Sequence, residues 1–214
     1  MINGNILVPM TKLVIIRHGN TFAPGEVTRR VGGRTDLPLV QSGLDQVAAL
    51  GRHFKERGLV PDVVFTSHLQ RTRQTAQHIL LNLGVNTSMY EDVIFNEIDY
   101  GPDENKPEEI VKERIGQDAL DRWDREGRVP EGWVFDSEEA IENWRKFADK
   151  ILIEYPGKTI FVVTSNGIAR FAPYLTGDFA GFCQNFSIKL PTGAYGVLVN
   201  QGQNWSVECW GERS

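Results

Sequence analysis

The sequence predicts an α/β fold, a three-layer sandwich with a mostly parallel central sheet and helices on both faces. Short aliphatic runs alternate with segments whose apolar residues recur at helical spacing, a pattern typical of parallel strands joined by helices. The chain has 214 residues, enough to bury a sizeable core without disulfides or metals. Apolar residues make up 41% and charged residues 24%, as in ordinary globular proteins. We therefore expect a single domain over residues 1–214.

The first expected elements are a strand, a loop and a helix. Residues 12–17 (KLVIIR) predict a buried strand, because they form a short aliphatic run that is followed by a glycine. Glycines and prolines over residues 20–40 predict a long loop, and loops of that length are often functional. Ser42 to Asp45 matches a capping box, which would open a helix that ends near Gly58.

The middle of the chain predicts a second strand and helix and then an insertion. Residues 62–66 (DVVFT) predict a buried strand, and residues 71–83 predict a helix that is stopped by a glycine. A short strand is expected over residues 90–94. Residues 97–135 are acidic and interrupted by prolines, so we expect a helical insertion that covers the sheet edge.

The last part of the chain predicts a helix, a strand and an antiparallel edge. Ser137 is expected to cap a helix with apolar residues at helical spacing. Residues 159–164 (TIFVVT) predict a third buried strand, and residues 168–175 predict a short helix. Further strands separated by glycine turns are expected over 182–190, 195–200 and 206–210.

Charge and composition argue against several classes of function. The net charge of −5, from 23 basic and 28 acidic residues, argues against general nucleic-acid binding. No apolar run approaches the ~18 residues of a membrane span, and residues 1–9 lack the features of a signal peptide. Cys183 and Cys209 are too few for a disulfide framework and lack metal-ligand spacing. We expect a cytoplasmic protein without a membrane partner, and the oligomeric state stays open.

Reactive side chains follow the predicted strands. In parallel sheets, ligands bind beyond the carboxyl ends of the strands. Arg17 and His18 end the first run, Arg71 follows the second, Asn166 follows the third, and Glu97 follows the weaker run before the insertion. A histidine between arginines and opposite a carboxylic acid suits phosphoryl transfer. The imidazole attacks phosphorus, the guanidiniums neutralise the oxygens, and the acid protonates the leaving group.

Five segments follow one another in an order that is typical of one protein family. They are RHGNT (17–21), RVGGRTDLPLVQSG (30–43), SHLQRTRQTA (67–76), EIDYG (97–101) and VVTSNG (162–167). With them the chain resembles the histidine phosphatase superfamily, also called the phosphoglycerate mutase-like family. Each segment alone is a weak signal, but their order on matching elements makes the resemblance specific.

The resemblance implies a role for each matching residue. His18 would be the histidine that becomes phosphorylated, while Arg17 and Arg71 would hold the transferring phosphate. Glu97 would act as the acid or base on the leaving oxygen. In most relatives a second histidine follows the third strand, and Asn166 stands at that position here.

Several other residues are expected near the phosphate or the rest of the substrate. The phosphate-binding candidates are Asn20, Thr21, Asn166 and Gly167. The substrate-binding candidates are Arg30, Arg34 and His68.

The chain departs from the family pattern at two places. The sequence has 4 histidines and none after position 78, so the second histidine is absent rather than shifted. The Asn166 amide can donate to a phosphate oxygen but carries no charge, which could reduce activity. Many relatives also have an asparagine six residues after the first histidine, where this chain has Pro24.

We therefore expect a metal-independent phosphomonoester hydrolase that acts through a phosphohistidine at His18. No metal or other cofactor is expected, because arginines supply the positive charge, and the partner would be a small phosphorylated substrate or inorganic phosphate. Two alternatives stay open. One is a phosphotransferase of the phosphoglycerate mutase type, and the other is a phospho-ligand-binding protein of the same fold whose turnover is lost with the second histidine.

Overall fold

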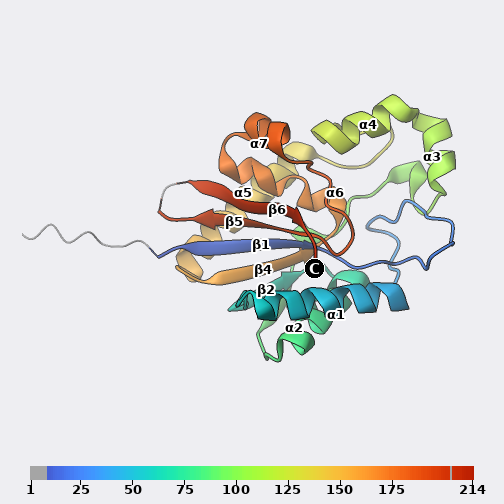
Figure 1. The fold of residues 1–214 in the computed structure, drawn as a ribbon. Coiled ribbons are helices and arrows are strands. Elements are labelled where there is room, and N and C mark those ends of the chain that lie inside the picture. The colour runs from blue at the N-terminus through green and yellow to red at the C-terminus, as the bar shows by residue number, and fades with distance from the viewer. Residues whose placement is uncertain (1–8, 203) are drawn as a thin grey trace, which may run out of the picture.

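The computed structural model describes residues 9–202 and 204–214, and within them it confirms the three-layer α/β arrangement (Figure 1). The described strands form one sheet in the order β3-β2-β4-β1-β5-β6. β1 to β4 are parallel, while β5 and β6 add the expected antiparallel edge. The strands are β1 (Thr11–Arg17), β2 (Val63–Thr66), β3 (Met89–Glu91), β4 (Thr159–Thr164), β5 (Tyr195–Asn200) and β6 (Trp205–Glu212).

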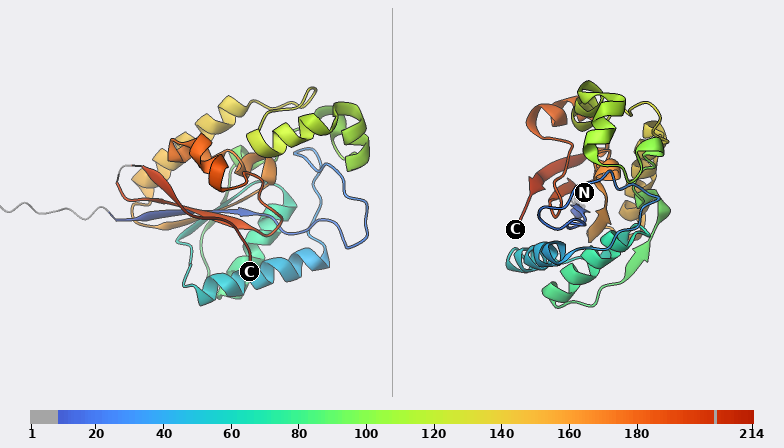
Figure 2. Two further views of the ribbon diagram at one scale, coloured as in Figure 1. Left: turned by 45° about the horizontal axis from the view of Figure 1, so that its top comes forward. Right: turned by 90° about the vertical axis from the view of Figure 1, so that its right-hand side faces the viewer.

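Helices cover both faces of the sheet (Figure 2). On one face lie α1 (Gln41–Glu56) and α2 (Gln70–Leu83). The other side carries α3 (Glu108–Ile115), α4 (Gln117–Glu126), α5 (Ser137–Glu154), α6 (Asn166–Ala169) and α7 (Phe179–Asn185). Single 3₁₀ turns are η1 (Val93–Phe95), η2 (Gly101–Asp103) and η3 (Ala172–Thr176). In the part of the chain that the structure describes, none of these helices combines the length and apolarity needed to span a bilayer.

The aliphatic run of β1 is buried on both of its faces. Val14 and Ile16 belong to the core beneath α1 and α2. Leu13 and Ile15 point the other way and belong to the core beneath α5. This explains why the strand reads as a continuous apolar run and not as an alternating pattern.

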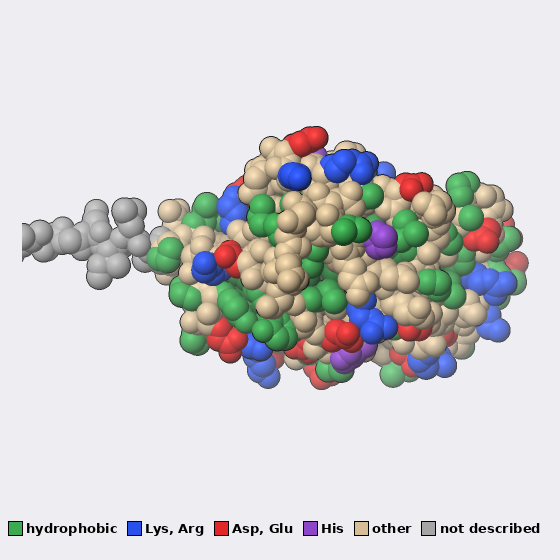
Figure 3. Space-filling model, turned by 90° about the horizontal axis from the view of Figure 1, so that it is seen from below, with side chains coloured by type: hydrophobic (Ala, Val, Ile, Leu, Met, Phe, Trp, Pro, Cys, Tyr) green, Lys and Arg blue, Asp and Glu red, His purple; other side chains and the backbone are tan. Residues whose placement is uncertain are grey.

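The layer formed by α1 and α2 is held together by a close helix contact. A Cβ atom at Gly51 of α1 would lie 2.7 Å from the Cβ atom of Asn82 and 2.9 Å from the carbonyl oxygen of Ile79, both on α2. The outer face of this layer carries charged side chains of both signs, scattered over both helices (Figure 3). The pair therefore buries one apolar stripe and solvates the other side.

The strand order brings the carboxyl ends of β1 and β4 together. The chain leaves β1 for β2 and β3, and then returns to place β4 between β1 and β2. Arg17, the last residue of β1, lies opposite Thr164, the last residue of β4. The loop after β1 and the helices α3 and α4 lie at this same edge (Figure 1). Such a reversal of strand order is where open α/β sheets bind ligands.

Both predicted serine caps are wrong. α1 begins at Gln41 after Val40, whose backbone amide donates to the Asn20 carbonyl oxygen at 3.1 Å, so the loop and not a side chain fixes this helix start. α5 is capped by Asp136 and not by Ser137. The Asp136 carboxylate accepts from the amides of residues 138 and 139 at 2.9 and 3.1 Å, and a carboxylate also complements the positive end of the helix dipole.

The predicted strand over residues 182–190 is also wrong. Residues 179–185 form α7, because Asp178 caps it by accepting from the Gly181 amide at 2.9 Å. Phe182 packs edge-on against Trp210 with ring centroids 5.2 Å apart, so the apolar residues follow a helical face. Two smaller differences are that β3 gives way to η1 after Glu91, and that Pro173 lies in η3, apart from α6.

Candidate active site

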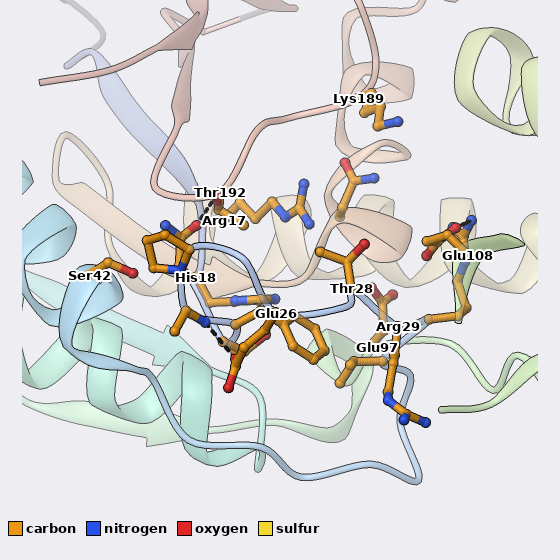
Figure 4. A pocket seen from close by; sticks show the side chains of 18 of the residues that line it. Arg17, His18, Glu26, Thr28, Arg29, Ser42, Glu97, Glu108, Lys189 and Thr192 are labelled. Carbon is orange, nitrogen blue, oxygen red and sulfur yellow. Dashed lines mark hydrogen bonds and ion pairs between the residues drawn. The ribbon is translucent and has the colours of Figure 1, made fainter. Parts of the chain in front are cut away.

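A cavity of about 680 Å³ opens at the carboxyl ends of β1 and β4. Its lining includes seven of the sequence-predicted residues but not Arg71 or Gly167. The seven are Arg17, His18, Asn20, Thr21, Arg30, Glu97 and Asn166. Figure 4 shows His18 and Ser42 on one side of it, with Lys189, Arg29 and Glu108 on the opposite side. Its volume is in the range of sites that bind small molecules and is much larger than one phosphate group needs.

Backbone hydrogen bonds fix His18 at the start of the loop after β1. Its amide donates to the Thr164 carbonyl oxygen at 3.1 Å, and its own carbonyl oxygen accepts from the Gly193 amide at 3.1 Å. The imidazole is 6% exposed, and its Nδ1 lies 2.8 Å from the Gly19 carbonyl oxygen. A carbonyl oxygen can only accept, so Nδ1 must carry a proton, and in a neutral imidazole Nε2 then carries the lone pair.

The charge state of His18 follows from its surroundings. Burial, together with the positive charges of Arg71 and Arg17, holds the pKa of His18 well below its ordinary value of 6.5. The hydrogen bond to Gly19 acts in the opposite direction and is outweighed. The imidazole is therefore neutral near pH 7, with an unprotonated Nε2.

Arg71 is fully buried and Arg17 is half-buried beside this imidazole. Nη1 of Arg17 donates to the Leu190 carbonyl oxygen at 2.6 Å, and Arg71 donates to the carbonyl oxygens of Thr35 and Gly32 at 2.9 and 3.2 Å. Within the described residues, neither guanidinium forms an ion pair, and the Nε of each is buried without a hydrogen-bond partner. Burial lowers the pKa of each, and the charge of Glu97 raises it. Buried cations without partners mark a site for an anion.

Glu97 reaches the same cavity from the loop after η1. Its Oε1 accepts from the Ile98 amide at 3.0 Å, and its Oε2 accepts from the Gly167 amide at 3.2 Å. A Cβ atom at position 167 would lie 2.1 Å from Oε1 of Glu97. Gly167, predicted to bind phosphate, therefore has its N–H directed to the carboxylate, and its lack of a side chain lets Glu97 approach.

Asn166 begins α6 and is tied to Arg17 through one residue. Oδ1 of Asn166 accepts from the Leu190 amide at 2.9 Å, and the Leu190 carbonyl oxygen accepts from Arg17. Because the Leu190 amide can only donate, it fixes which end of the Asn166 side chain is the oxygen. The NH₂ end is then left as the donor available to the cavity.

Asn20 and Thr21, predicted to bind phosphate, also line the cavity. Oδ1 of Asn20 accepts from the Thr192 hydroxyl at 2.5 Å, and its amide donates to Gln46 at 3.1 Å. A Cβ atom at Gly43 would lie 2.2 Å from the Asn20 carbonyl oxygen, so the loop lies directly against α1.

Of the three predicted substrate-binding residues, one lines the cavity and two do not. Arg30 lines the cavity, pairs with Glu108, and lies over the ring of Tyr100 at 5.3 Å. Arg34 is not part of the lining, because its Nε pairs with an Asp99 carboxylate oxygen at 2.9 Å on the outer side. His68 is also outside it, as an exposed residue.

The sequence did not single out three residues at this site. Ser42 lines the cavity, although its sequence pattern had suggested a helix cap. Lys189 lines it from a segment that had been predicted as strand. Arg170 is completely buried behind α6. Its position four residues after Asn166, one helical turn away, is the sequence feature that could have identified it. In residues 9–202 and 204–214, no group of three or more His, Cys, Asp or Glu side chains could hold a metal ion.

Comparisons with known proteins support the family resemblance. The model described as "Histidine phosphatase superfamily (branch 1)" matches residues 13–213. A 2,3-bisphosphoglycerate-dependent phosphoglycerate mutase of Chelativorans sp. is 30% identical over 169 residues, which is 77% of this chain and 81% of that protein.

Two solved structures have the same fold. YhfR of Bacillus stearothermophilus has a TM-score of 0.77 at 20% identity, and covers 95% of this chain and 98% of its own. A mycobacterial glucosyl-3-phosphoglycerate phosphatase has a TM-score of 0.75 at 17% identity, and covers 94% of this chain and 99% of its own. At such identities the match shows the fold alone.

The depressed pKa of His18 makes stability depend on pH. The unfolded chain takes up a proton on this imidazole as the pH falls through 6.5, but the folded chain does not. The wild type should therefore lose unfolding free energy below pH 6.5, relative to His18→Asn, by up to about 1.4 kcal/mol per pH unit. Urea unfolding of both proteins at a series of pH values measures this difference. Parallel curves for the two proteins would show that His18 is not held neutral.

Proposed function

We propose that this chain, which belongs to the histidine phosphatase superfamily, hydrolyses small phosphate monoesters through a phosphohistidine at His18. The observation that carries the proposal is the state of this imidazole. It is neutral, its Nδ1 is occupied by the Gly19 carbonyl oxygen, and its Nε2 is left as a nucleophile in the field of half-buried Arg17 and buried Arg71. A histidine that served only to pack the loop would not require two arginines without ion-pair partners beside it.

In the first step, Nε2 of His18 attacks phosphorus and the bond to the leaving oxygen breaks. Arg17, which lines the cavity, and Arg71, which acts from the buried side of His18, offset the negative charge on the phosphoryl oxygens, and the Asn166 amide donates to one of them. Glu97 gives a proton to the leaving oxygen, which departs as an alcohol. In the second step, Glu97 takes a proton from water, the hydroxide attacks phosphorus, and the His18–phosphorus bond breaks to release inorganic phosphate.

The proposed chemistry places the charge stabilisation on guanidiniums. Because Arg17 and Arg71 are fixed by carbonyl oxygens, they require no reorganisation when the phosphate arrives. We propose that neither a metal nor another cofactor takes part, so that a chelator leaves the rate unchanged.

Phosphoryl transfer between phosphoglycerates is a second candidate, favoured by the similarity to a protein named as a mutase. We rank it lower because two outer cations of the cavity are already paired, Arg30 with Glu108 and Lys189 with Asp124. A phosphoglycerate carries a carboxylate beside its phosphate, and cations that are already paired would bind this carboxylate more weakly. With 3-phosphoglycerate and 2,3-bisphosphoglycerate, a mutase would form 2-phosphoglycerate without net phosphate release, whereas a hydrolase would release phosphate.

Turnover and covalent trapping test the central proposal. Wild-type protein in chelator should release p-nitrophenol linearly and, after a rapid quench, carry acid-labile phosphate. His18→Ala should show neither, while its melting curve stays close to that of the wild type. If the wild type binds inorganic phosphate tightly but forms no product, the chain is a phospho-ligand-binding protein and the proposal is wrong.

The proton from Glu97 should matter in proportion to the basicity of the leaving group. We expect Glu97→Gln to slow alkyl phosphates by roughly 10²-fold or more, and p-nitrophenyl phosphate much less. Gly167→Ala should produce the same selective loss, because a methyl group there displaces the carboxylate without changing its chemistry. Initial rates on both substrates measure this. Equal slowing of both substrates would assign Glu97 a structural role.

A further inference from the structure

Arg170 is a buried cation whose surroundings do not match its charge. It follows α6 and is 0% exposed. Its Nη1 donates to the Trp123 carbonyl oxygen, its Nε donates to the Asn166 carbonyl oxygen at 3.2 Å, and its guanidinium lies 3.8 Å from the centre of the Trp123 ring. Nη2 is buried with no hydrogen-bond partner among the described residues.

The nearest carboxylate to Arg170 is distant and shared. Oδ1 of Asp124 lies 3.9 Å from Nη2, and the side chain of Asp124 is 33% exposed. The other oxygen of Asp124 binds Nζ of Lys189, so this acid is divided between two cations. A fully buried charge needs closer compensation than this.

Arg170 lies within electrostatic range of the candidate active site. Burial lowers its pKa to about 10, while Tyr100, Asp124 and Glu97 raise it and Arg17 lowers it. It therefore stays charged at neutral pH. The charged and titratable groups that face it come from the loop after η1, from α4 and from β1.

The groups at and behind the cavity carry more positive than negative charge. Arg71 and Arg170 are buried cations, Arg17 is a half-buried cation, and Glu97 is the buried carboxylate near them. His18 is neutral and so is the Asn166 amide, while Asp124 is offset by Lys189. With Glu97 counted as ionised, these groups leave two positive charges, which equals the charge of a phosphate dianion.

We propose that Arg170 is a positioning residue for the phosphate, acting through Asn166. Its Nε holds the Asn166 carbonyl oxygen and so the first turn of α6, and its guanidinium supplies a permanent positive charge behind the neutral amide that faces the cavity. This inference rests on the proposed function and assigns a further residue to the same site. It implies that binding of a phosphate dianion depends on a side chain that never touches it.

Binding of inorganic phosphate, measured by calorimetry, tests the proposal without requiring turnover. Arg170→Gln should weaken binding roughly tenfold, while Arg170→Lys, which keeps the charge but loses the Nε hydrogen bond to Asn166, should recover part of that loss. Arg145→Gln, an exposed arginine on α5, is the matched control and should bind like the wild type. Arg170→Gln should also slow alkyl and p-nitrophenyl phosphates by the same factor, because it acts on the phosphate and not on the leaving group.

A second comparison works even if Arg170→Gln fails to fold. The comparison is between Lys189→Gln and the double variant Lys189→Gln with Asp124→Asn. Asp124→Asn removes the acid that partly offsets the charge of Arg170. Lys189 is already replaced in both proteins, because loss of Asp124 would otherwise leave its positive charge unpaired. Phosphate should then bind several-fold more tightly. Because Asp124 also lines the cavity, the gain is compared with that of Glu26→Gln, which neutralises another lining acid, and should exceed it. A gain no larger than that of Glu26→Gln would show that Arg170 is not involved. Unchanged or weaker binding overturns the proposal, as does a folded Arg170→Gln with wild-type affinity. Wild-type phosphate binding without hydrolysis would overturn the proposed function alone.

Discussion

Two guanidiniums, half-buried Arg17 and buried Arg71, govern the rest of this site, and neither forms an ion pair within the described residues. Each is anchored by backbone carbonyl oxygens and not by carboxylates, so its charge is left available to a ligand. Their field, added to burial, keeps His18 neutral. The same pair of residues therefore prepares the nucleophile and attracts the anion that it would attack, which couples binding to reactivity.

The fold places these groups with few backbone segments. β1 ends at Arg17 and is followed directly by His18, and the insertion of β4 beside β1 places Asn166 next to them. The main chain of Leu190 then bonds Asn166 on one side and Arg17 on the other. The segment before β5 is thus part of the site, although it contributes mainly backbone atoms to these bonds.

The sequence was most informative where a long apolar run ends in polar residues. It predicted the strands that end at or just before Arg17, His18 and Asn166. Strands buried on both faces are continuous apolar runs, which are easier to recognise than strands that alternate apolar and polar residues. It failed at Ser42, where a capping pattern was coincidental, and at Lys189, where aromatic residues on a helix resembled a strand. Those errors come from tertiary contacts that local patterns do not contain.

Other features of the site have no signal in a single sequence. The tautomer of His18 depends on the Gly19 carbonyl oxygen, and the orientation of Asn166 depends on a residue far along the chain. Gly167 is needed because Glu97 lies close to its Cα, a contact that no sequence pattern shows. The prediction that Gly167 binds phosphate rests only on its position in the motif. Arg34 and His68 were assigned from their positions in the motifs, and the structure directs both away from the cavity.

Nitrogen-15 NMR of the imidazoles is the most direct test of the account, because the chain has only 4 histidines and His18→Asn identifies the relevant signal. The account predicts that His18 is neutral, with its proton on Nδ1, and stays so as the pH falls below 6.5 for as long as the protein is folded. A His18 signal that titrates near pH 6.5, or that places the proton on Nε2, would contradict it.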